Sequence, residues 1–427
     1  MKKALIISPY FAPSNAADMQ RIRMSLPYFS ANNWEVELVT VDTKHSDFPI
    51  DPLLLKSIPS GIIIHKVGAF SKKWTSKFGL GSIALRSLYF YRKKVNTLLS
   101  KNRYDLIYFS TTQFPVCILG AYWKKKFGIP YVIDIQDMWH SDYYQNKPKA
   151  ERPKKYWFSY RLNKYLEPIA MKHADGIISV SKNYIDILKQ RYPNLQSKPT
   201  EVITFGAFDV DFEIAEQYAA ELDITYQTNS NRINLVYVGR GGHDMRESLQ
   251  ILFECFKEGL NNNTALFERI HFNFIGTSYA PAGTGVPTIK PIADEFGMGK
   301  YVTEITDRIG FFKSIRNLQK ANGLLIIGSN DGNYTASKLF PYILTGNHIL
   351  AILHTNSSAG SILKTCNAGE LITLQENIID SAKIFKEFID KINMNIPLNI
   401  KWEEFEPYTA AYLTKKQTNV FNQIIAY

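Results

Sequence analysis

The sequence is poor in cysteine and has no long apolar run. Its three cysteines, Cys117, Cys255 and Cys366, are odd in number and far apart, so neither a disulfide framework nor a zinc site is expected, and a reducing compartment is favoured. No apolar stretch approaches the roughly 18 residues that a membrane-spanning helix needs. The apolar run within Ala4–Ser8 is also too short for the core of a secretory signal. We expect it to form a first buried strand.

Acidic residues are scarce in the first half of the chain. Residues 1–205 contain 31 lysines and arginines against 15 acidic residues, whereas residues 206–427 contain 19 against 24. Two basic segments, 72–101 and 147–164, also carry aromatic side chains, including Trp74 and Trp157. Their basic residues are Lys72, Lys73, Lys77, Arg86, Arg92, Lys93, Lys94 and Lys101, then Lys147, Lys149, Arg152, Lys154, Lys155, Arg161 and Lys164.

This mixture of basic and aromatic residues has three interpretations. It suits an anionic membrane surface, and it also suits single-stranded nucleic acid. A solvated helix face that covers core aromatic residues has the same pattern. We favour the membrane surface, keep the solvated face open, and consider nucleic acid the least favoured partner.

The rest of the composition is that of a globular protein, with 45% hydrophobic and 21% charged residues. A chain of 427 residues is too long for a single core, so two domains are expected.

Short apolar runs alternate with helical patterns in the first half, which predicts an α/β domain with a parallel sheet. The expected strands are Ala4–Ser8, Val36–Val41, Ile62–Val67, Leu106–Ser110, Tyr131–Ile135 and Gly176–Val180. The expected helices are Asp18–Asn32, Leu85–Lys101, Val116–Phe127, Tyr156–His173 and Lys182–Arg191.

The same alternation restarts in the second half, which predicts a second doubly wound sheet. The segment Asp209–Asn231 is polar and acidic, and we interpret it as part of a connection. The expected strands are Ile233–Gly239, His271–Gly276, Tyr301–Ile305, a run from Leu324 and Ile349–Leu353; the expected helices are Met245–Gly259, Pro287–Phe296, Lys313–Ala321, Thr355–Thr365 and Tyr408–Ile425. A ligand is expected in a cleft between the two domains.

One unit of the second half carries the clearest ligand signal. The buried strand from Leu324 ends in a polar glycine loop at 328–333, and Ser337 and Lys338 open the next helix. Ligands of open α/β sheets bind at the carboxyl ends of strands, and an ammonium beside free N–H groups at a helix start attracts an anion. An ordinary strand–helix–strand unit explains the same spacing.

Other strand ends in this half also carry residues suited to a nucleotide. They are Gly239, Arg240 and Arg246 at the first, Gly276, Thr277, Ser278 and Tyr279 at the second, and Arg308 at the third. Arginine can hold a diphosphate through paired hydrogen bonds. The convergence of these ends favours a nucleotide site, although the sequence has neither a dinucleotide fingerprint nor a P-loop.

In the first half, one strand end places two carboxylates beside a tryptophan. Asp134 lies within the strand, and Asp137 and Trp139 follow it. Asp137 is expected in the loop, where a carboxylate can orient a hydroxyl group or act as a base. For Asp134, a structural acid satisfied by backbone N–H groups is an open alternative.

The loop after the first strand is the second candidate in this half. Its small residues, including Ser14 and Asn15, allow close approach of a ligand. Arg21 is expected to face either that ligand or solvent.

These motifs, in this order, resemble those of bacterial glycosyltransferases of the family-4 type, which have the GT-B fold. The matching stretches are 8–21, 104–107, 134–139, 174–181, 237–240, 276–281 and 334–342. The resemblance implies an α/β protein with two Rossmann-like doubly wound domains that face a cleft. Residues 1–205 would bind the acceptor, residues 206–405 the nucleotide sugar, and residues 406–427 would form a terminal helix returning to the first domain.

The implied reaction is the retaining transfer of a hexose-like sugar from a nucleotide diphosphate sugar to a glycan or lipid-linked acceptor. It would serve surface polysaccharide or glycoconjugate assembly, with no cofactor and no metal ion. A cytoplasmic location is expected, with peripheral attachment to the inner face of the cell membrane.

The resemblance also implies roles for individual residues. Asp137, Arg240 and Lys338 would be catalytic. The nucleotide sugar would contact Gly239, Arg246, Gly276, Thr277, Ser278, Tyr279, Arg308, Ser337 and Tyr342, and the acceptor side would include Ser14, Asn15, Arg21, Asp134 and Trp139.

The main departures of the chain from the family concern two acidic positions. Family members commonly have two glutamates eight positions apart, and Asn333 and Pro341 stand at those places here. A sugar-nucleotide epimerase of the same fold and a non-catalytic relative that binds nucleotide sugars are therefore kept as alternatives.

Overall fold

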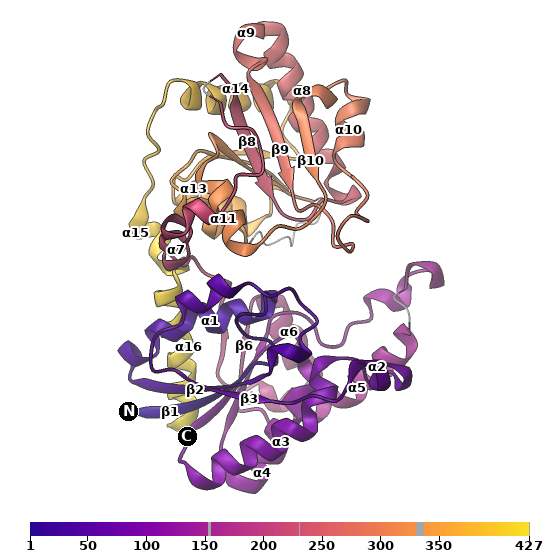
Figure 1. The fold of residues 1–427 in the computed structure, drawn as a ribbon, viewed down its shortest axis with the longest axis vertical. Coiled ribbons are helices and arrows are strands. Elements are labelled where there is room, and N and C mark those ends of the chain that lie inside the picture. Colours follow the sequence, from indigo (N-terminus) through magenta and orange to yellow (C-terminus); the bar gives the residue numbers. More distant parts are fainter. Residues whose placement is uncertain (153–154, 230, 330–336, 427) are drawn as a thin grey trace. The chain divides into compact units, whose positions relative to one another are not determined.

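The computed structural model describes residues 1–152, 155–229, 231–329 and 337–426, and the chain divides into two compact units (Figure 1). Unit 1 comprises Met1–Gly206 and Tyr408–Tyr427, and unit 2 comprises Ala207–Pro407. Each unit has its own parallel sheet with helices packed on it. The predicted α/β class, with two doubly wound Rossmann-like domains, is confirmed.

The sheet of unit 1 has seven strands in the order β3-β2-β1-β4-β5-β6-β7, and neighbouring strands are parallel. The strands are β1 (Lys2–Ile7), β2 (Trp34–Val41), β3 (Ile63–Val67), β4 (Leu106–Ser110), β5 (Tyr131–Ile135), β6 (Gly176–Ser179) and β7 (Thr200–Val202). The six predicted runs all form strands. The short edge strand β7 was not predicted, because its three residues are only half-buried and lack an apolar pattern.

The helices of unit 1 follow the predicted order with two exceptions. They are α1 (Gln20–Ser25), α2 (Lys72–Thr75), α3 (Ile83–Lys101), α4 (Ile118–Phe127), α5 (Tyr156–Met171), α6 (Lys182–Arg191) and α16 (Ala410–Ile425). The short helix α2 was not predicted. The single helix predicted over 18–32 is wrong, since α1 ends at Ser25 and short 3-10 turns follow. Pro27 explains the break, because proline has no N–H to donate to the preceding turn.

Helix α16 belongs to unit 1 although it lies at the end of the chain (Figure 1, yellow). Phe421 is fully buried, with its ring centroid 5.3 Å from that of Trp34 and 5.0 Å from that of Tyr108. Gln417 donates to the hydroxyl of Ser25 at 2.8 Å. The last helix therefore completes the core of the first unit.

The sheet of unit 2 has six strands in the order β10-β9-β8-β11-β12-β13, again parallel. The strands are β8 (Ile233–Val238), β9 (Ile270–Ile275), β10 (Val302–Ile305), β11 (Gly323–Ile327), β12 (Ile349–Leu353) and β13 (Glu370–Thr373). The helices are α7 (Val210–Gln217), α8 (Arg246–Asn262), α9 (Thr264–Phe267), α10 (Lys290–Glu295), α11 (Phe311–Gln319), α12 (Leu339–Leu344), α13 (Ser358–Thr365), α14 (Ile378–Asn393) and α15 (Trp402–Phe405).

The interpretation of Asp209–Asn231 as a simple connection is wrong in its first part. Residues 210–217 form α7, whose Ile214 and Ala215 are buried and whose Asp209 accepts a hydrogen bond at the start of the helix. The acidic residues that suggested a connection lie largely on the outer side of this short helix, since Glu213 and Glu216 are exposed.

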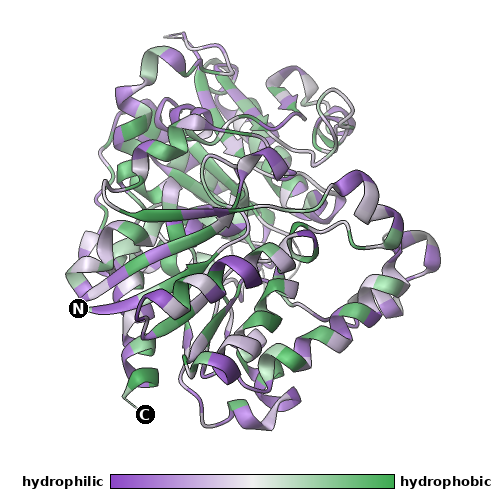
Figure 2. Cartoon of the chain, turned by 60° about the horizontal axis from the view of Figure 1, so that its bottom comes forward, coloured by the Kyte–Doolittle hydropathy of each residue, from purple (hydrophilic) through white to green (hydrophobic). Residues whose placement is uncertain are grey.

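Apolar residues concentrate in the strands, as Figure 2 shows by the long green stretches along them, whereas the helices carry both colours. This distribution matches sheets buried on both faces by amphipathic helices. In both sheets the strand order reverses once, between β1 and β4 in unit 1 and between β8 and β11 in unit 2. Loops at the carboxyl ends of these pairs of strands are the expected ligand positions.

A buried ion pair ties distant parts of unit 1 together. The Arg21 guanidinium donates to Asp134 at 2.6 Å and to the carbonyl groups of Ile203 and Thr204 at 2.6 and 3.1 Å. The side chains of Arg21 and Asp134 are 2% and 0% exposed. The pair thereby joins α1, β5 and the segment that follows β7.

We expect Arg21→Ala to lower the free energy of unfolding of unit 1 by about 3–5 kcal/mol, because it leaves a buried carboxylate without its partner. The matched control is Arg103→Ala, which breaks a 3.9 Å ion pair whose arginine is 93% exposed and should cost at most about 1 kcal/mol. Urea unfolding followed by tryptophan fluorescence measures both. Equal losses in the two variants would contradict the structural role of the buried pair.

Candidate functional site

The predicted anion residue Lys338 lies at the point where the strand order of unit 2 reverses. It immediately precedes α12, and its ammonium donates to the hydroxyl of Tyr237 at 2.6 Å, 4.0 Å from the centre of that ring. Tyr237 is the fifth residue of β8, and its hydroxyl in turn donates to the carbonyl group of Arg240 at 2.7 Å. These contacts hold the ammonium beside the loop that follows β8.

Gly239 makes room for this ammonium. Its φ of 146° is strained for residues with a side chain, and a Cβ atom there would lie 2.5 Å from Nζ of Lys338. Tyr342 fixes the same loop, because its hydroxyl accepts from the N–H of Val238 at 2.8 Å. The backbone conformation therefore favours glycine after β8, and a side chain there would displace the ammonium of Lys338.

Two positive charges meet at this position. Burial, together with the nearby charge of Arg240, lowers the pKa of Lys338 to about 7. In the parts of the chain that the structure describes, no carboxylate forms an ion pair with Lys338, whereas Arg240 makes two hydrogen bonds to Asp244, at 3.0 and 2.6 Å. Two neighbouring cations of which only one is paired with a carboxylate attract an anion.

Because α12 has only six residues, we attribute this attraction to the two side chains rather than to the helix terminus. Ser337, next to Lys338, is exposed.

The loop after β9 contributes the remaining predicted residues. Gly276 has a φ of 74°, and the exposed ring of Tyr279 lies 4.7 Å from the guanidinium carbon of Arg308. The contacts thus connect Lys338, Tyr237 and Arg240 in one group, and Tyr279 and Arg308 in another.

Three residues that were predicted to contact the nucleotide sugar form hydrogen bonds to other protein groups. The guanidinium of Arg246 pairs with Glu295 at 2.5 Å on the surface, so it does not extend the cationic pair. Thr277 is buried, and its hydroxyl donates to Glu304 at 2.7 Å. Ser278 accepts from the N–H of Ala280 at 3.1 Å. These are the contacts that the three side chains make in the structure, and their predicted contacts with a nucleotide sugar stay predictions.

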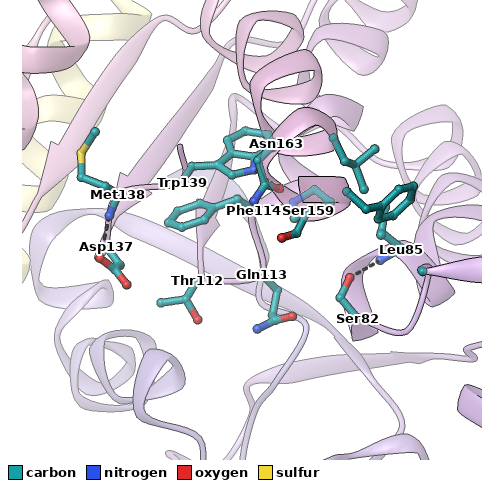
Figure 3. Close-up of a pocket in the computed structure, with 14 residues that line it drawn as sticks. Ser82, Leu85, Thr112, Gln113, Phe114, Asp137, Met138, Trp139, Ser159 and Asn163 are labelled. Atoms are coloured by element: carbon teal, nitrogen blue, oxygen red, sulfur yellow. Dashed lines mark hydrogen bonds between the residues drawn. The ribbon is translucent and has the colours of Figure 1, made fainter. Parts of the chain in front are cut away.

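In unit 1, Asp137 lines a cavity of about 320 Å³ (Figure 3). Its carboxylate is exposed, and its one hydrogen-bond partner among the described residues is the N–H of the next residue, Met138, at 2.8 Å. Figure 3 shows Asp137, Thr112 and Gln113 along one side of an aromatic pair. The cavity therefore combines a free carboxylate oxygen with hydroxyl and amide groups.

The aromatic pair consists of Phe114 and Trp139, whose ring centroids are 5.5 Å apart at an angle of 18°. The indole N–H of Trp139 donates to Asn163 at 3.2 Å, which fixes the ring. Phe158 and Leu162 add further apolar surface. Trp139, which the sequence predicted on the acceptor side, therefore lines the same cavity as Asp137.

The other acceptor-side predictions need correction. Arg21 faces neither ligand nor solvent, and Asp134 is its buried partner, which agrees with the structural alternative for Asp134 but not with backbone N–H groups as its partners. Ser14 is buried with its hydroxyl 2.5 Å from that of Ser46, and the N–H of Asn15 donates to the carbonyl group of Pro49 at 2.9 Å. The lining of the cavity around Asp137 includes none of these four residues. Arg21 and Asp134 pair between α1 and β5, and Ser14 and Asn15 lie in the loop after β1.

Some predicted positions lie outside the described residues, namely the polar loop from residue 330, Asn333 and the stretch Tyr334–Ala336 of the matching motif. Among the residues that the structure does describe, no group of three or more His, Cys, Asp and Glu side chains could hold a metal ion. None of the described helices is both long and apolar enough to cross a membrane.

Sequence reasoning missed the partners that complete both sites. Tyr237 was part of a predicted buried strand, Phe114 preceded a predicted helix and Asn163 lay within one. A signal for Tyr237 existed, because a tyrosine near the end of an otherwise aliphatic strand needs a partner for its hydroxyl group.

Comparison with known proteins agrees with this geometry. Residues 26–207 match the family described as Glycosyltransferase Family 4, a stretch that lies almost entirely in unit 1. No curated protein sequence gives a significant match.

Solved structures match the fold over the whole chain. Sucrose-phosphate synthase from Thermosynechococcus elongatus has a TM-score of 0.60 at 13% identity, covering 100% of both chains. Alr3699/HepE from Anabaena, in complex with UDP-glucose, has a TM-score of 0.54 at 14% identity, covering 100% of this chain and 99% of that one. WaaG, a glycosyltransferase involved in lipopolysaccharide biosynthesis, has a TM-score of 0.53 at 12% identity, covering 99% of each chain.

Identities this low show a likeness of fold alone, and the family match adds the sequence evidence in unit 1. The family match confirms the resemblance inferred from the sequence motifs over residues 26–207, and the solved structures match the GT-B fold that this resemblance implies.

Proposed function

We propose that the chain transfers a sugar from a nucleotide diphosphate sugar to a glycan or lipid-linked acceptor in surface polysaccharide or glycoconjugate assembly. The observation that supports this most is the pair formed by Lys338 and Arg240 at the strand reversal of unit 2. A relative of the same fold is described in complex with UDP-glucose, which makes UDP-glucose the first donor to test.

The cationic pair would act on the leaving group. When the bond between the sugar and the diphosphate breaks, negative charge develops on the diphosphate oxygen, and fixed positive charges stabilise that state. Tyr237 and Gly239 hold the ammonium of Lys338 in place before the donor binds. The half-buried position of Lys338 strengthens the interaction, because the local dielectric constant is lower than in water.

In unit 1, Asp137 would orient the acceptor hydroxyl group, and Phe114 and Trp139 would support the acceptor sugar. Charge neutralisation and positioning then suffice for a retaining transfer of a hexose, and no covalent bond to the protein is required.

The two alternatives predict different outcomes. A sugar-nucleotide epimerase would convert the donor without an acceptor, whereas the glycosyltransferase family match and the aromatic cavity in unit 1 favour transfer. A non-catalytic relative would bind the donor without turnover, an alternative that remains because Asn333 and Pro341 replace the usual glutamates. Product analysis of UDP-glucose incubations with and without a glycan acceptor distinguishes all three.

We expect Lys338→Met to weaken the binding of a nucleoside diphosphate by about 1.5–3 kcal/mol, the range for hydrogen bonds to charged groups. Since the pKa of Lys338 is about 7, its ammonium is charged below that pH and loses its proton above it. The advantage of the wild-type protein should therefore shrink as the pH rises from about 6.5 to 8.5. Calorimetry at each pH measures both affinities.

Lys257→Met is the matched control, because Lys257 is an exposed lysine on α8. It should leave affinity unchanged. Wild-type affinity equal to that of Lys338→Met at pH 6.5 would reject Lys338 as a diphosphate ligand.

We also propose that catalysis needs no metal ion, because Arg240 and Lys338 supply the positive charge that a cation would bring to the diphosphate. Turnover of the nucleotide sugar should be the same with EDTA as with added magnesium or manganese. Loss of turnover in EDTA that either metal restores would overturn this proposal.

The basic segments of unit 1 support a peripheral membrane location. Trp74, Phe78 and Trp157 are 65%, 74% and 64% exposed. The ammonium of Lys77 lies 4.7 Å from the ring of Trp74, and the guanidinium of Arg161 lies 5.7 Å from that of Trp157. We call these five residues the basic–aromatic surface.

The two segments that form this surface touch each other. Lys155, just before α5, donates to the carbonyl group of Ser76 at 3.1 Å, and a Cβ atom at Gly79 would lie 2.5 Å from the ring of Phe158. Exposed aromatic rings flanked by cations suit the interface of an anionic bilayer.

Liposome co-sedimentation tests this location. Binding to anionic liposomes should weaken with salt, because exposed charges are screened over roughly 8–10 Å, and a salt-resistant remainder should fall in Trp74→Ala. Trp402→Ala is the control, since Trp402 is 51% exposed in unit 2. Failure to bind anionic liposomes even at low salt would reject the peripheral membrane location and favour a soluble acceptor.

A further inference from the structure

Unit 1 contains a second cavity, of about 560 Å³, whose lining is strongly basic. It lies in the loops that follow β2 and β3, and its charged lining residues are Lys44, Lys72, Lys73 and Arg86, together with Asp47. Neither the donor site nor the cavity around Asp137 includes these residues. We call it the basic pocket.

Arg86 forms the floor of the basic pocket. It is 3% exposed, and its guanidinium donates to the carbonyl groups of Gly81, Phe70 and His45 at 3.2–3.3 Å and to Asp47 at 3.2 Å. Three of these four acceptors are neutral. The orientation of the guanidinium is therefore fixed, but its charge is offset only by Asp47.

Asp47 cannot offset the whole pocket. Among the described residues that line it, Asp47 is the only acid, and it also accepts from Lys72 at 2.8 Å and from the hydroxyl of Tyr10 at 3.0 Å. Lys44 has its own partner outside the lining, Asp42, at 3.7 Å. The four cations of the lining therefore have two carboxylate partners, Asp47 in the pocket and Asp42 outside it. The pocket keeps an excess of positive charge beside the buried guanidinium of Arg86.

The basic pocket adjoins the cavity that we assign to the acceptor. Leu85 lines the cavity around Asp137 and Arg86 lines the basic pocket, so consecutive residues at the start of α3 separate them. In the segment before α3, Gly79 lines the cavity around Asp137 and Lys73 lines the basic pocket. A ligand bound by both would have an anionic group on one side of α3 and a sugar ring on the other.

We propose that the basic pocket binds a phosphate or diphosphate group of the acceptor, so that the acceptor is a phosphorylated saccharide or a diphosphate-linked lipid. The assignment of the acceptor rests on the proposed function, whereas the phosphate site does not. Phosphate fits better than a carboxylate, because its charge of about −1.5 to −2 matches the excess positive charge and because its several oxygens can meet separate lysines. The hydroxyl groups of Ser46 and Ser71, which also line the pocket, are further donors.

Calorimetry with inorganic pyrophosphate on the full chain tests the site. The background is Lys338→Met, which weakens the proposed diphosphate site of unit 2. Adding Lys72→Gln and Lys73→Gln should weaken pyrophosphate binding at least tenfold, because it removes two of the four cations. Adding Lys93→Gln and Lys125→Gln instead makes the same charge change at exposed positions outside the pocket and should change affinity less than threefold.

Equal affinities in the three proteins would overturn the proposal. Lys44→Gln gives an independent check on the same background, with a smaller loss expected, and thermal melting verifies that each variant is folded. Because Lys72 and Lys73 are exposed, their replacement leaves Arg86 paired with Asp47.

Two further probes identify the source of the phosphate, each compared with its inorganic counterpart. Farnesyl diphosphate that binds more tightly than pyrophosphate supports a diphosphate-linked lipid, and glucose 1-phosphate that binds more tightly than inorganic phosphate supports a sugar phosphate. Either preference should disappear in the Lys72→Gln/Lys73→Gln protein. A preference that persists there does not arise from the basic pocket.

The affinity for nucleoside diphosphate, measured with Lys338 intact, separates the two proposals. Pyrophosphate binding in the basic pocket without any nucleotide binding would reject the proposed donor site alone. Nucleotide binding without a pyrophosphate site in unit 1 would reject the phosphate inference alone.

Discussion

The parallel arrangement of the strands is the constraint on which the rest of this structure depends. In a parallel sheet every strand runs in the same direction, so the loops that follow the strands all emerge at one edge. In unit 2 this brings together Gly239 after β8, Gly276 after β9 and the residues that precede α12. In unit 1 it collects the loop of Asp137 after β5 and the basic pocket after β2 and β3. Residues that are distant in sequence meet because of strand direction.

In each unit, the charges near a cationic side chain decide whether that side chain stabilises the fold or is available to bind a ligand. Arg21 is buried against Asp134 and two carbonyl groups, so its charge is used inside unit 1. Lys338 is half-buried beside another cation, so its charge remains available to a ligand. Arg86 is intermediate, since its geometry is fixed by carbonyl groups while its charge is only partly offset. The same chemical groups thus serve stability in one place and binding in another.

The fold was largely predictable from the sequence, because buried parallel strands appear as short continuous apolar runs. The predicted strands failed to include β7 and β13, which are edge strands with less apolar burial. The long helix α14 was also missed, although Phe385, Phe388, Ile389 and Ile392 form a buried helical stripe. A single helix was predicted over residues 18–32 because the apolar residues there have helical spacing. Pro27 has no backbone N–H, and the α-helix ends before it.

The candidate site was predictable only in part. Position along the chain identified Lys338, Arg240 and Asp137, since each follows a strand or opens a helix. Sequence could not show which charges are already paired, because the partner of Arg21 lies 113 residues away and that of Arg246 lies 49 residues away. The same limitation hid Tyr237 as the partner of Lys338, 101 residues before it. Pairing is a property of the tertiary structure, and it distinguishes Arg21, which is buried against its carboxylate partner, from Lys338, which donates to the hydroxyl of Tyr237.

Helix α16 has a consequence for the order in which the protein folds during synthesis. Domains generally fold as units while the chain emerges from the ribosome, the N-terminal one first. Here the core of unit 1 includes Phe421, which is packed against Trp34 and Tyr108. The surface of unit 1 that α16 covers therefore stays exposed until all of unit 2 has been synthesised. Unit 2 is continuous in sequence and can close before the unit that precedes it.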